Sequence, residues 1–400
     1  MPKGGPAACA TPAACAPPDL PLPASPTPPV TSTDMNALSP DLILGLSFAL
    51  AFIFALIGQK THFCTMGAVA DIVNMGDWNR MRMWLLAIGV AILGAGSLEL
   101  AGLIDLNKSL YRGGSLPWLS FTLGGFCFGF GMVLASGCGS KTLLRIGGGN
   151  LKSLVVLLVL GLTAYMTMRG LFGVWRVNLL DPWSIPLPQG ADLTSLLRQA
   201  GVDGSLARGL AVYGCGGALV AWSLARRDFW TLDNLVGGLG SGLVIVAAWY
   251  VSGHLGYVAE HPETLQEAFL ATNSGRMEAF TFVGPVAYTL EWLMLWSDSS
   301  RVLTVGITTV LGLLAGSLLW SLATRSFRWE GFGGVEDTAN HLIGAALMGF
   351  GGVTALGCTI GQGLSGVSTL ALGSFLALAA IIAGAVAALK FQYWRIMREA

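Results

Sequence analysis

Three cysteines in this chain lie in short glycine-rich segments that interrupt or border long apolar runs. They are Cys64 within His62–Gly67, Cys138 within Ser136–Lys141 and Cys358 within Leu356–Gly361. The last two segments are copies of one another, because residues 130–138 align without a gap to residues 350–358. A duplicated membrane unit that places a thiol at the break of each half predicts a translocation path through a transporter.

The composition is that of a polytopic membrane protein. Of the 400 residues, 54% are hydrophobic and only 11% are charged, whereas soluble domains carry about 25% charged residues. The mean hydropathy is +0.66. Several apolar runs approach the roughly 20 residues that cross a bilayer, namely 42–57, 84–103, 151–168, 206–224, 302–323 and 370–389. The net charge is zero and basic aromatic patches are absent from the sequence, which argues against a nucleic-acid partner.

The predicted fold is therefore all-α, with about nine to ten transmembrane helices in a lipid bilayer. In the first half we expect helices near 40–58, 81–104, 118–136 and 151–170, with glycine-rich loops at Cys64 and Cys138. In the second half we expect helices near 206–225, 234–252, 280–297, 301–323, 338–355 and 370–391, with a loop at Cys358.

The chain divides into five parts by composition. A Pro/Ala-rich tail over 1–38 is too poor in bulky apolar residues to bury a core, so we expect it to be disordered. The expected order is then a first transmembrane half over 39–170, a connector over 171–205, a second half over 206–392 and a short tail over 393–400. Three basic residues near the end, Lys390, Arg395 and Arg398, predict a cytoplasmic C-terminus by the positive-inside rule.

The two copied segments have the composition of an anion site. Irregular backbone at membrane depth is tolerated only where protein buries it or where it lines a wet cavity, and free N–H groups at helix breaks bind anions. Around Cys138 the supporting residues are Gly137, Gly139, Lys141 and Arg145. Around Cys358 they are Gly357, Thr359, Gly361 and Gln362. A thiol is soft and weakly polar, so it suits a sulfur-containing anion better than phosphate.

Other functions are less well supported by the residues. Small Gly and Cys residues also serve close helix packing, but that reading leaves the repeated polar segments unexplained. The sequence holds no zinc-ligand spacing, Walker A motif or Ser/His/Asp arrangement, so we predict no catalytic residue, metal or cofactor. Two alternatives remain open: a membrane thiol enzyme that carries a persulfide, with Cys138 beside Lys141 and Arg145, and a structural subunit without transport.

Acidic residues give weaker predictions. Glu99 and Glu291 fall close to expected helix ends, where we expect their side chains to reach the membrane surface. Three further acidic residues, Glu330, Glu336 and Asp337, follow Arg325 and Arg328, and we expect local ion pairs among them.

In these motifs the chain resembles the YeeE/YedE family of bacterial membrane proteins over most of residues 40–392. The resemblance rests on Phe63–Asp71, on Gly137 and Cys138 followed by Arg145 and Gly147, and on Ser326–Arg328 with Gly349–Gly351 and Gly357–Leu364. The chain departs from the family pattern at Leu356, where a second glycine is common, in its Pro-rich tail and in its wide connector.

The resemblance implies a fold and a function. It implies an hourglass-like fold of two pseudo-symmetric halves and uptake of thiosulfate across the bacterial inner membrane. It also implies that Cys64, Cys138 and Cys358 line the substrate path and pass the anion inward through transient S–H···S contacts. A small cytoplasmic sulfur carrier of the TusA type is an implied partner. Related proteins handle other sulfur or selenium compounds, which leaves the substrate open within that class.

Overall fold

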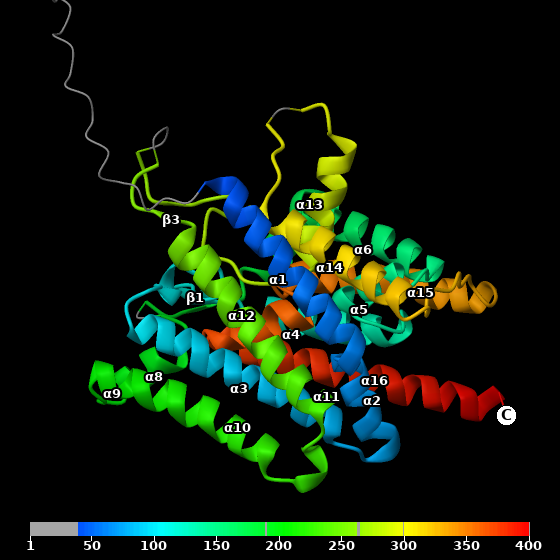
Figure 1. Ribbon diagram of the computed structural model, residues 1–400, viewed down its shortest axis with the longest axis horizontal. Helices are drawn as coiled ribbons and strands as arrows, with labels where there is room; N and C mark the ends of the chain where they lie inside the picture. The colour runs from blue at the N-terminus through cyan, green and yellow to red at the C-terminus, as the bar shows by residue number, and fades with distance from the viewer. Residues whose placement is uncertain (1–38, 189, 262–264, 299, 400) are drawn as a thin grey trace, which may run out of the picture. The chain divides into compact units, whose positions relative to one another are not determined.

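The computed structural model describes residues 39–188, 190–261, 265–298 and 300–399, and it is mainly helical (Figure 1). The predicted tail over 1–38, which holds Cys9 and Cys15, lies outside the described residues. Four two-residue strands form two antiparallel pairs, β1 (Ser115–Leu116) with β2 (Ile185–Pro186) and β3 (Tyr257–Val258) with β4 (Ala268–Phe269). These pairs lie in the connecting segments, so helices make up the rest of the architecture.

Helices of the first half follow the apolar runs closely. They are α1 (Pro40–Thr61), α2 (Thr65–Met75), α3 (Asn79–Leu100), η1 (Leu106–Lys108), α4 (Trp118–Leu134), α5 (Gly139–Gly147) and α6 (Leu151–Arg169). The segment predicted to connect the halves contains α7 (Leu171–Trp175), η2 (Arg176–Leu180) and α8 (Leu193–Gln199).

Residues 204–399 contain wide helical turns that join short helices into longer ones. The first elements are α9 (Gly204–Gly209), η3 (Leu210–Gly214), α10 (Cys215–Leu224), η4 (Arg227–Phe229), α11 (Leu232–Leu235), η5 (Val236–Gly240), α12 (Ser241–Tyr250) and η6 (Val251–Leu255). They are followed by α13 (Val283–Met294), α14 (Val305–Ala323), α15 (Val335–Thr354), η7 (Gly361–Gly366) and α16 (Leu372–Glu399).

Seven helical stretches in the described part of the chain are long and apolar enough to cross a membrane. They are Pro40–Met75, Asn79–Leu100, Trp118–Gly147, Leu151–Arg169, Leu232–Leu255, Val305–Ala323 and Leu372–Arg398. The expected nine to ten spans also included α9–α10, α13 and α15. Of these, α13 has only 12 residues, too few to span a bilayer, and α15 begins with Glu336 and Asp337.

Close backbone contact brings the two copied cysteine segments together. Helix α4, which leads to Cys138, packs against α15, which leads to Cys358, and also against α16. A β-carbon at Gly124 of α4 would lie 2.9 Å from the Gly351 carbonyl oxygen of α15, so only glycine allows this approach. Small residues commonly permit such packing between membrane helices, where it replaces the hydrophobic driving force of soluble cores. Helix α1 lies beside α14 and α12 (Figure 1).

Two acidic residues expected at the membrane surface are buried in ion pairs instead. Glu99, with a side chain only 4% exposed, binds Arg112 at 2.7 Å. Glu291, whose side chain is 5% exposed, binds Arg301 at 3.1 Å and accepts a hydrogen bond from Tyr165. The surface prediction for Glu99 and Glu291 is therefore wrong, because basic partners from nearby loops satisfy each carboxylate inside the protein.

The expectation of local pairing around α15 is also wrong. Glu330 and Asp337 bind Lys152 of α6, at 3.5 and 3.1 Å. Glu336 binds Arg395 near the end of α16. The acidic partners thus tie the start of α15 to two other helices rather than to the preceding arginines.

Candidate functional site

Each of the three cysteines lies immediately before a helical segment. Cys64 precedes α2, and its sulfur accepts a hydrogen bond from the Gly67 N–H at 3.5 Å. Cys138 precedes α5. Cys358 precedes helical turns over residues 359–368, and its sulfur accepts from the Gly361 N–H at 3.4 Å. The sequence prediction of loops here needs correction, because the chain turns sharply before each cysteine and resumes a helix directly after it.

The sharp turn has the same backbone geometry at all three sites. The residue two positions before each cysteine has a left-handed conformation, with φ of 52° at His62, 57° at Ser136 and 56° at Leu356. None of these residues is glycine, and such conformations persist only where the surrounding structure holds them. In the two copied segments the next residue closes the same turn, since the Gly137 N–H binds the Met132 oxygen and the Gly357 N–H binds the Gly352 oxygen.

The three thiols gather in the protein interior. The Cys64 and Cys138 side chains lie within hydrogen-bonding reach of each other, and Cys358 is close to Cys138. Cys138 and Cys358 are 2% and 0% exposed, and all three cysteines are free thiols. Because each thiol stands at a helix N-terminus, partly positive backbone N–H groups surround the cluster, and such groups favour a bound anion.

An aromatic cluster packs beside the thiols. Phe63, the residue before Cys64, stacks on Trp84 with ring centroids 5.8 Å apart. Phe54 makes contact with the rings of Phe63, Phe280 and Phe282, and Phe282 also donates its backbone N–H toward Cys358. The Cys64 and Cys358 thiols therefore have aromatic rings nearby.

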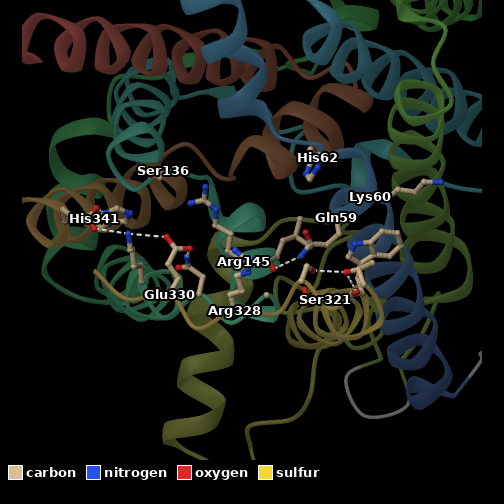
Figure 2. Close-up of a pocket in the computed structure, with 17 residues that line it drawn as sticks. Gln59, Lys60, His62, Ser136, Arg145, Ser321, Arg328, Glu330 and His341 are labelled. Carbon is tan, nitrogen blue, oxygen red and sulfur yellow. Dashed lines mark hydrogen bonds and ion pairs between the residues drawn. The ribbon is translucent and has the colours of Figure 1, made fainter. Parts of the chain in front are cut away.

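A cavity of about 680 Å³, which we call the basic cavity, reaches two of the cysteine segments. Its lining includes His62 and Ser136, the left-handed residues before Cys64 and Cys138. Its other basic side chains are Lys60, Arg145, Lys152 and Arg328. Figure 2 shows Arg145 and Arg328 between Glu330 on one side and Gln59 on the other. Lys152 is neutralised by Glu330 and Asp337, so Lys60, Arg145 and Arg328 carry the positive charge of the cavity.

A smaller cavity of about 220 Å³ reaches the third cysteine segment, and we call it the small cavity. Leu356 and Gly357, directly before Cys358, line it together with Arg176 and Glu278. The two cavities lie toward opposite ends of α15, because His341 near its start lines the basic cavity whereas Gly352 and Val353 near its end line the small one. The lining of each cavity thus includes residues one or two positions before a cysteine, although none of Cys64, Cys138 and Cys358 is among the lining residues themselves.

The predicted supporting residues take different positions. Arg145 lines the basic cavity, and the half-buried Lys141 lies near Cys64 and Cys138. Gly137 is covered by Lys141, whereas Gly139 begins α5 against Phe282. On the copied segment, Gly357 lines the small cavity and Gly361 packs tightly on Thr281. The Thr359 hydroxyl faces the Cys138 sulfur, whereas the Gln362 amide nitrogen donates to the Ala355 oxygen and braces the turn.

Sequence reasoning missed several residues of this region. Gln59 donates to the Leu144 oxygen at 2.9 Å and to the Ser317 hydroxyl at 2.6 Å, which joins α1, α5 and α14 beside the basic cavity. Trp84 covers Gly363 of the turns after Cys358 as well as Phe63. A polar residue at the end of an apolar run could have pointed to Gln59, but nothing in the sequence pattern distinguishes Trp84.

Comparison with known proteins identifies the family of the chain. The family model described as sulphur transport matches residues 60–387. A protein of Escherichia coli (strain K12) named thiosulfate transporter TsuA is 27% identical over 364 residues, which cover 86% of this chain and 94% of the relative. A protein of Spirochaeta thermophila (strain ATCC 700085 / DSM 6578 / Z-1203) with the same name is 25% identical over 343 residues, covering 82% of this chain and 92% of the relative. Because the family model covers most of the chain, this protein belongs to the sulphur transport family, YeeE/YedE.

Proposed function

We propose that this chain imports thiosulfate, or a closely related sulfur anion, along a path lined by Cys64, Cys138 and Cys358. The observation that carries the proposal is the gathering of three free thiols, each at a helix N-terminus, between two cavities. The names of the two relatives indicate the substrate, since both are called thiosulfate transporters.

The path runs from the small cavity past Cys358, Cys138 and Cys64 to the basic cavity. A charge near the middle of a membrane costs at least about 2.5–3.5 kcal/mol, and a dianion more. Backbone N–H groups at the three helix starts, together with Lys141 and Arg145, offset that cost. Several weak contacts in succession serve conduction better than one tight site, because the anion must also leave. Thiols supply such contacts to a terminal sulfur atom.

The orientation follows from the basic residues at one end of the molecule. The basic cavity, the start of α15 and the end of α16 are joined by the ion pairs of Lys152 and Arg395. By the positive-inside rule this end faces the cytoplasm of a bacterial inner membrane, together with the C-terminus. A small sulfur carrier of the TusA type would then meet the anion at the basic cavity.

The finer architecture belongs to the same proposal. The shared backbone turn before Cys138 and Cys358 supports two pseudo-symmetric halves over 39–170 and 206–392, joined by the connector at 171–205. Two cavities that meet at the cysteine cluster support an hourglass-like arrangement. On this arrangement α13 and α15 also enter the membrane, which gives nine membrane helices with the seven apolar stretches, and α9–α10 supplies a tenth.

A second candidate function is a sulfur relay, favoured by the proximity of the Cys64 and Cys138 sulfurs. In that reaction a thiol of the protein takes the terminal sulfur of thiosulfate, so that a new S–S bond forms and the S–S bond of thiosulfate breaks. The products are a protein persulfide, which keeps the thiol proton, and sulfite as the leaving group. Mass spectrometry of the protein during turnover separates the two functions, since transport leaves the thiols unmodified.

Growth of a sulfur auxotroph on thiosulfate tests the proposal. The host lacks its own sulfate and thiosulfate importers, and it expresses the wild-type chain, Cys138→Ala or Cys358→Ala. Cys127→Ala and Cys215→Ala are matched controls, because these free thiols lie within helices outside the cluster. We expect growth with the wild type and the controls and no growth with the two path variants. Normal growth of both path variants would remove the thiol path from the account.

A further inference from the structure

A buried hydroxyl accompanies each cysteine of the cluster. Thr65 directly follows Cys64, Thr359 directly follows Cys358, and Ser140 follows Cys138 by two positions. Their exposed fractions are 2%, 0% and 6%. Each hydroxyl therefore stands in the first turn of a helical segment, next to a thiol and away from solvent.

One of these hydroxyls lacks a hydrogen-bond partner, and a second has only a sulfur atom within reach. Thr65 Oγ1 makes no hydrogen bond with any described residue, and Thr359 Oγ1 faces the Cys138 sulfur without a well-directed hydrogen bond. Ser140 differs, because its hydroxyl lies 3.3 Å from the Cys138 sulfur. Buried threonines elsewhere in the helices bind a carbonyl of their own helix, as Thr163 and Thr354 do. A buried hydroxyl left without a partner is unfavourable, so native proteins rarely retain one without a ligand or a specific role.

The position of the two threonines explains why their own helices do not satisfy them. A threonine in the first turn has no helical carbonyl four residues before it, whereas one in a helix interior does. The Thr359 hydroxyl is directed toward the Cys138 sulfur across the gap between the two copied segments. An O–H group at this point can donate to a guest that enters between the thiols.

We propose that Thr65 and Thr359 donate hydrogen bonds to the oxygen atoms of the transported anion while the adjacent thiols contact its terminal sulfur. The inference rests on the proposed transport function, and it concerns the selectivity of the path among sulfur anions. A thiol that contacts sulfur, next to a hydroxyl that donates to oxygen, suits a sulfur oxyanion that carries both a terminal sulfur and oxygens. Sulfide lacks the oxygens and sulfate lacks the terminal sulfur, so each leaves half of the contacts unused.

Neighbouring polar groups do not fill the same role. The unpartnered atom of Gln362 is its carbonyl-type oxygen, an acceptor, and its NH₂ group is engaged by Ala355. Anions require donors, so Gln362 serves the fold of the turn. The Ser140 hydroxyl is already occupied by Cys138. The two threonines are thus specificity-determining residues that can be changed without touching a cysteine.

The test measures uptake of ³⁵S-thiosulfate in cells that express Thr65→Val or Thr359→Val, which keep the side-chain shape and remove the hydroxyl. We expect KM to rise about tenfold in each, as for loss of one hydrogen bond to a charged group, with a smaller change in maximal rate. Thr65→Ser and Thr359→Ser keep a hydroxyl and should restore KM to within about twofold. Thr163→Val and Thr354→Val are matched controls that should leave KM unchanged.

Each outcome decides the matter. A wild-type chain that takes up no thiosulfate overturns the proposed function and this inference together. Uptake that depends on Cys138 but keeps a normal KM in both valine variants overturns the inference and leaves the function standing. Where a valine variant is absent from the membrane, Thr65→Ala or Thr359→Ala takes its place. A rise in KM with alanine that serine does not show supports the role of the hydroxyl.

Discussion

The buried ion pair between Glu99 and Arg112 offers a prediction whose magnitude follows from its geometry. Arg112 donates to both carboxylate oxygens of Glu99, at 2.7 and 3.3 Å, and its Nε donates to the Thr369 oxygen at 2.7 Å. The two side chains are 5% and 4% exposed. Thr369 ends the helical turns that follow Cys358, so Arg112 holds the far end of a cysteine segment.

Replacement of Arg112 by methionine leaves a carboxylate buried without its partner. Removal of one member of a buried pair destabilises a protein by about 3–5 kcal/mol, and the Thr369 carbonyl loses a bond worth about 1–3 kcal/mol. We therefore expect the free energy of unfolding to fall by about 4 kcal/mol or more in Arg112→Met. The double variant Glu99→Gln with Arg112→Met removes the uncompensated charge and should recover most of that loss.

In the double variant we expect uptake to stay low although the free energy of unfolding recovers. The double variant still lacks the bond from Arg112 to Thr369, so we expect it to be stable but to import thiosulfate more slowly than the wild type. Thermal unfolding in detergent measures the first quantity and ³⁵S-thiosulfate uptake the second, with the exposed Arg276→Met as control. An Arg112→Met protein that unfolds within about 1 kcal/mol of the wild type, or a double variant as unstable as the single one, would refute this prediction.

Three further predictions address the cavities and the helix packing. Burial raises the pKa of the Glu278 carboxyl despite hydrogen bonds from Ser274, so its neutral form persists to higher pH. Because a neutral carboxyl does not repel an anion in the small cavity, uptake should increase as external pH falls from about 7 to 5. Glu278→Gln should abolish that dependence on pH. Arg328→Gln should raise the KM for thiosulfate supplied on the side of the basic cavity, measured as exchange in proteoliposomes, about two- to fivefold at low salt and less at high salt, because screening weakens the attraction, with Lys390→Gln as control. Gly124→Val should destabilise the contact of α4 with α15 by about 1–3 kcal/mol in thermal unfolding, since its β-carbon meets the Gly351 oxygen at 2.9 Å. The first prediction would be contradicted by wild-type uptake that does not depend on pH. The second would be contradicted by an equal effect of Arg328→Gln at both salt concentrations, and the third by an unchanged melting temperature of Gly124→Val.

The helices could be predicted from the sequence because apolar runs of membrane length leave few alternatives. The expected helices near 118–136 and 301–323 correspond to α4 over Trp118–Leu134 and α14 over Val305–Ala323. The segments after the cysteines were expected as loops, because glycine and polar residues there are typical breakers. In the structure the turn is made two residues before each cysteine, by His62, Ser136 and Leu356, none of which is the glycine that a left-handed conformation favours.

The meeting of the three cysteines could be suspected from their repetition, but repetition alone does not place them together. Their proximity depends on the approach of α4 and α15 at Gly124, a contact between residues more than 200 positions apart. Ion-pair partners could not be read from the sequence for the same reason. Glu99 finds Arg112 across a connecting loop and Glu336 finds Arg395 on another helix, whereas sequence reasoning considered only neighbours along the chain.

Uptake of ³⁵S-thiosulfate by proteoliposomes that contain the purified chain tests the central claim most directly. The wild type, Cys138→Ala and Cys358→Ala are compared at equal protein content, with Cys127→Ala as the matched control for removal of a thiol. We expect uptake by the wild type and the control and almost none by the two path variants. Full uptake by Cys138→Ala and Cys358→Ala would show that the anion crosses the membrane without the cysteine cluster.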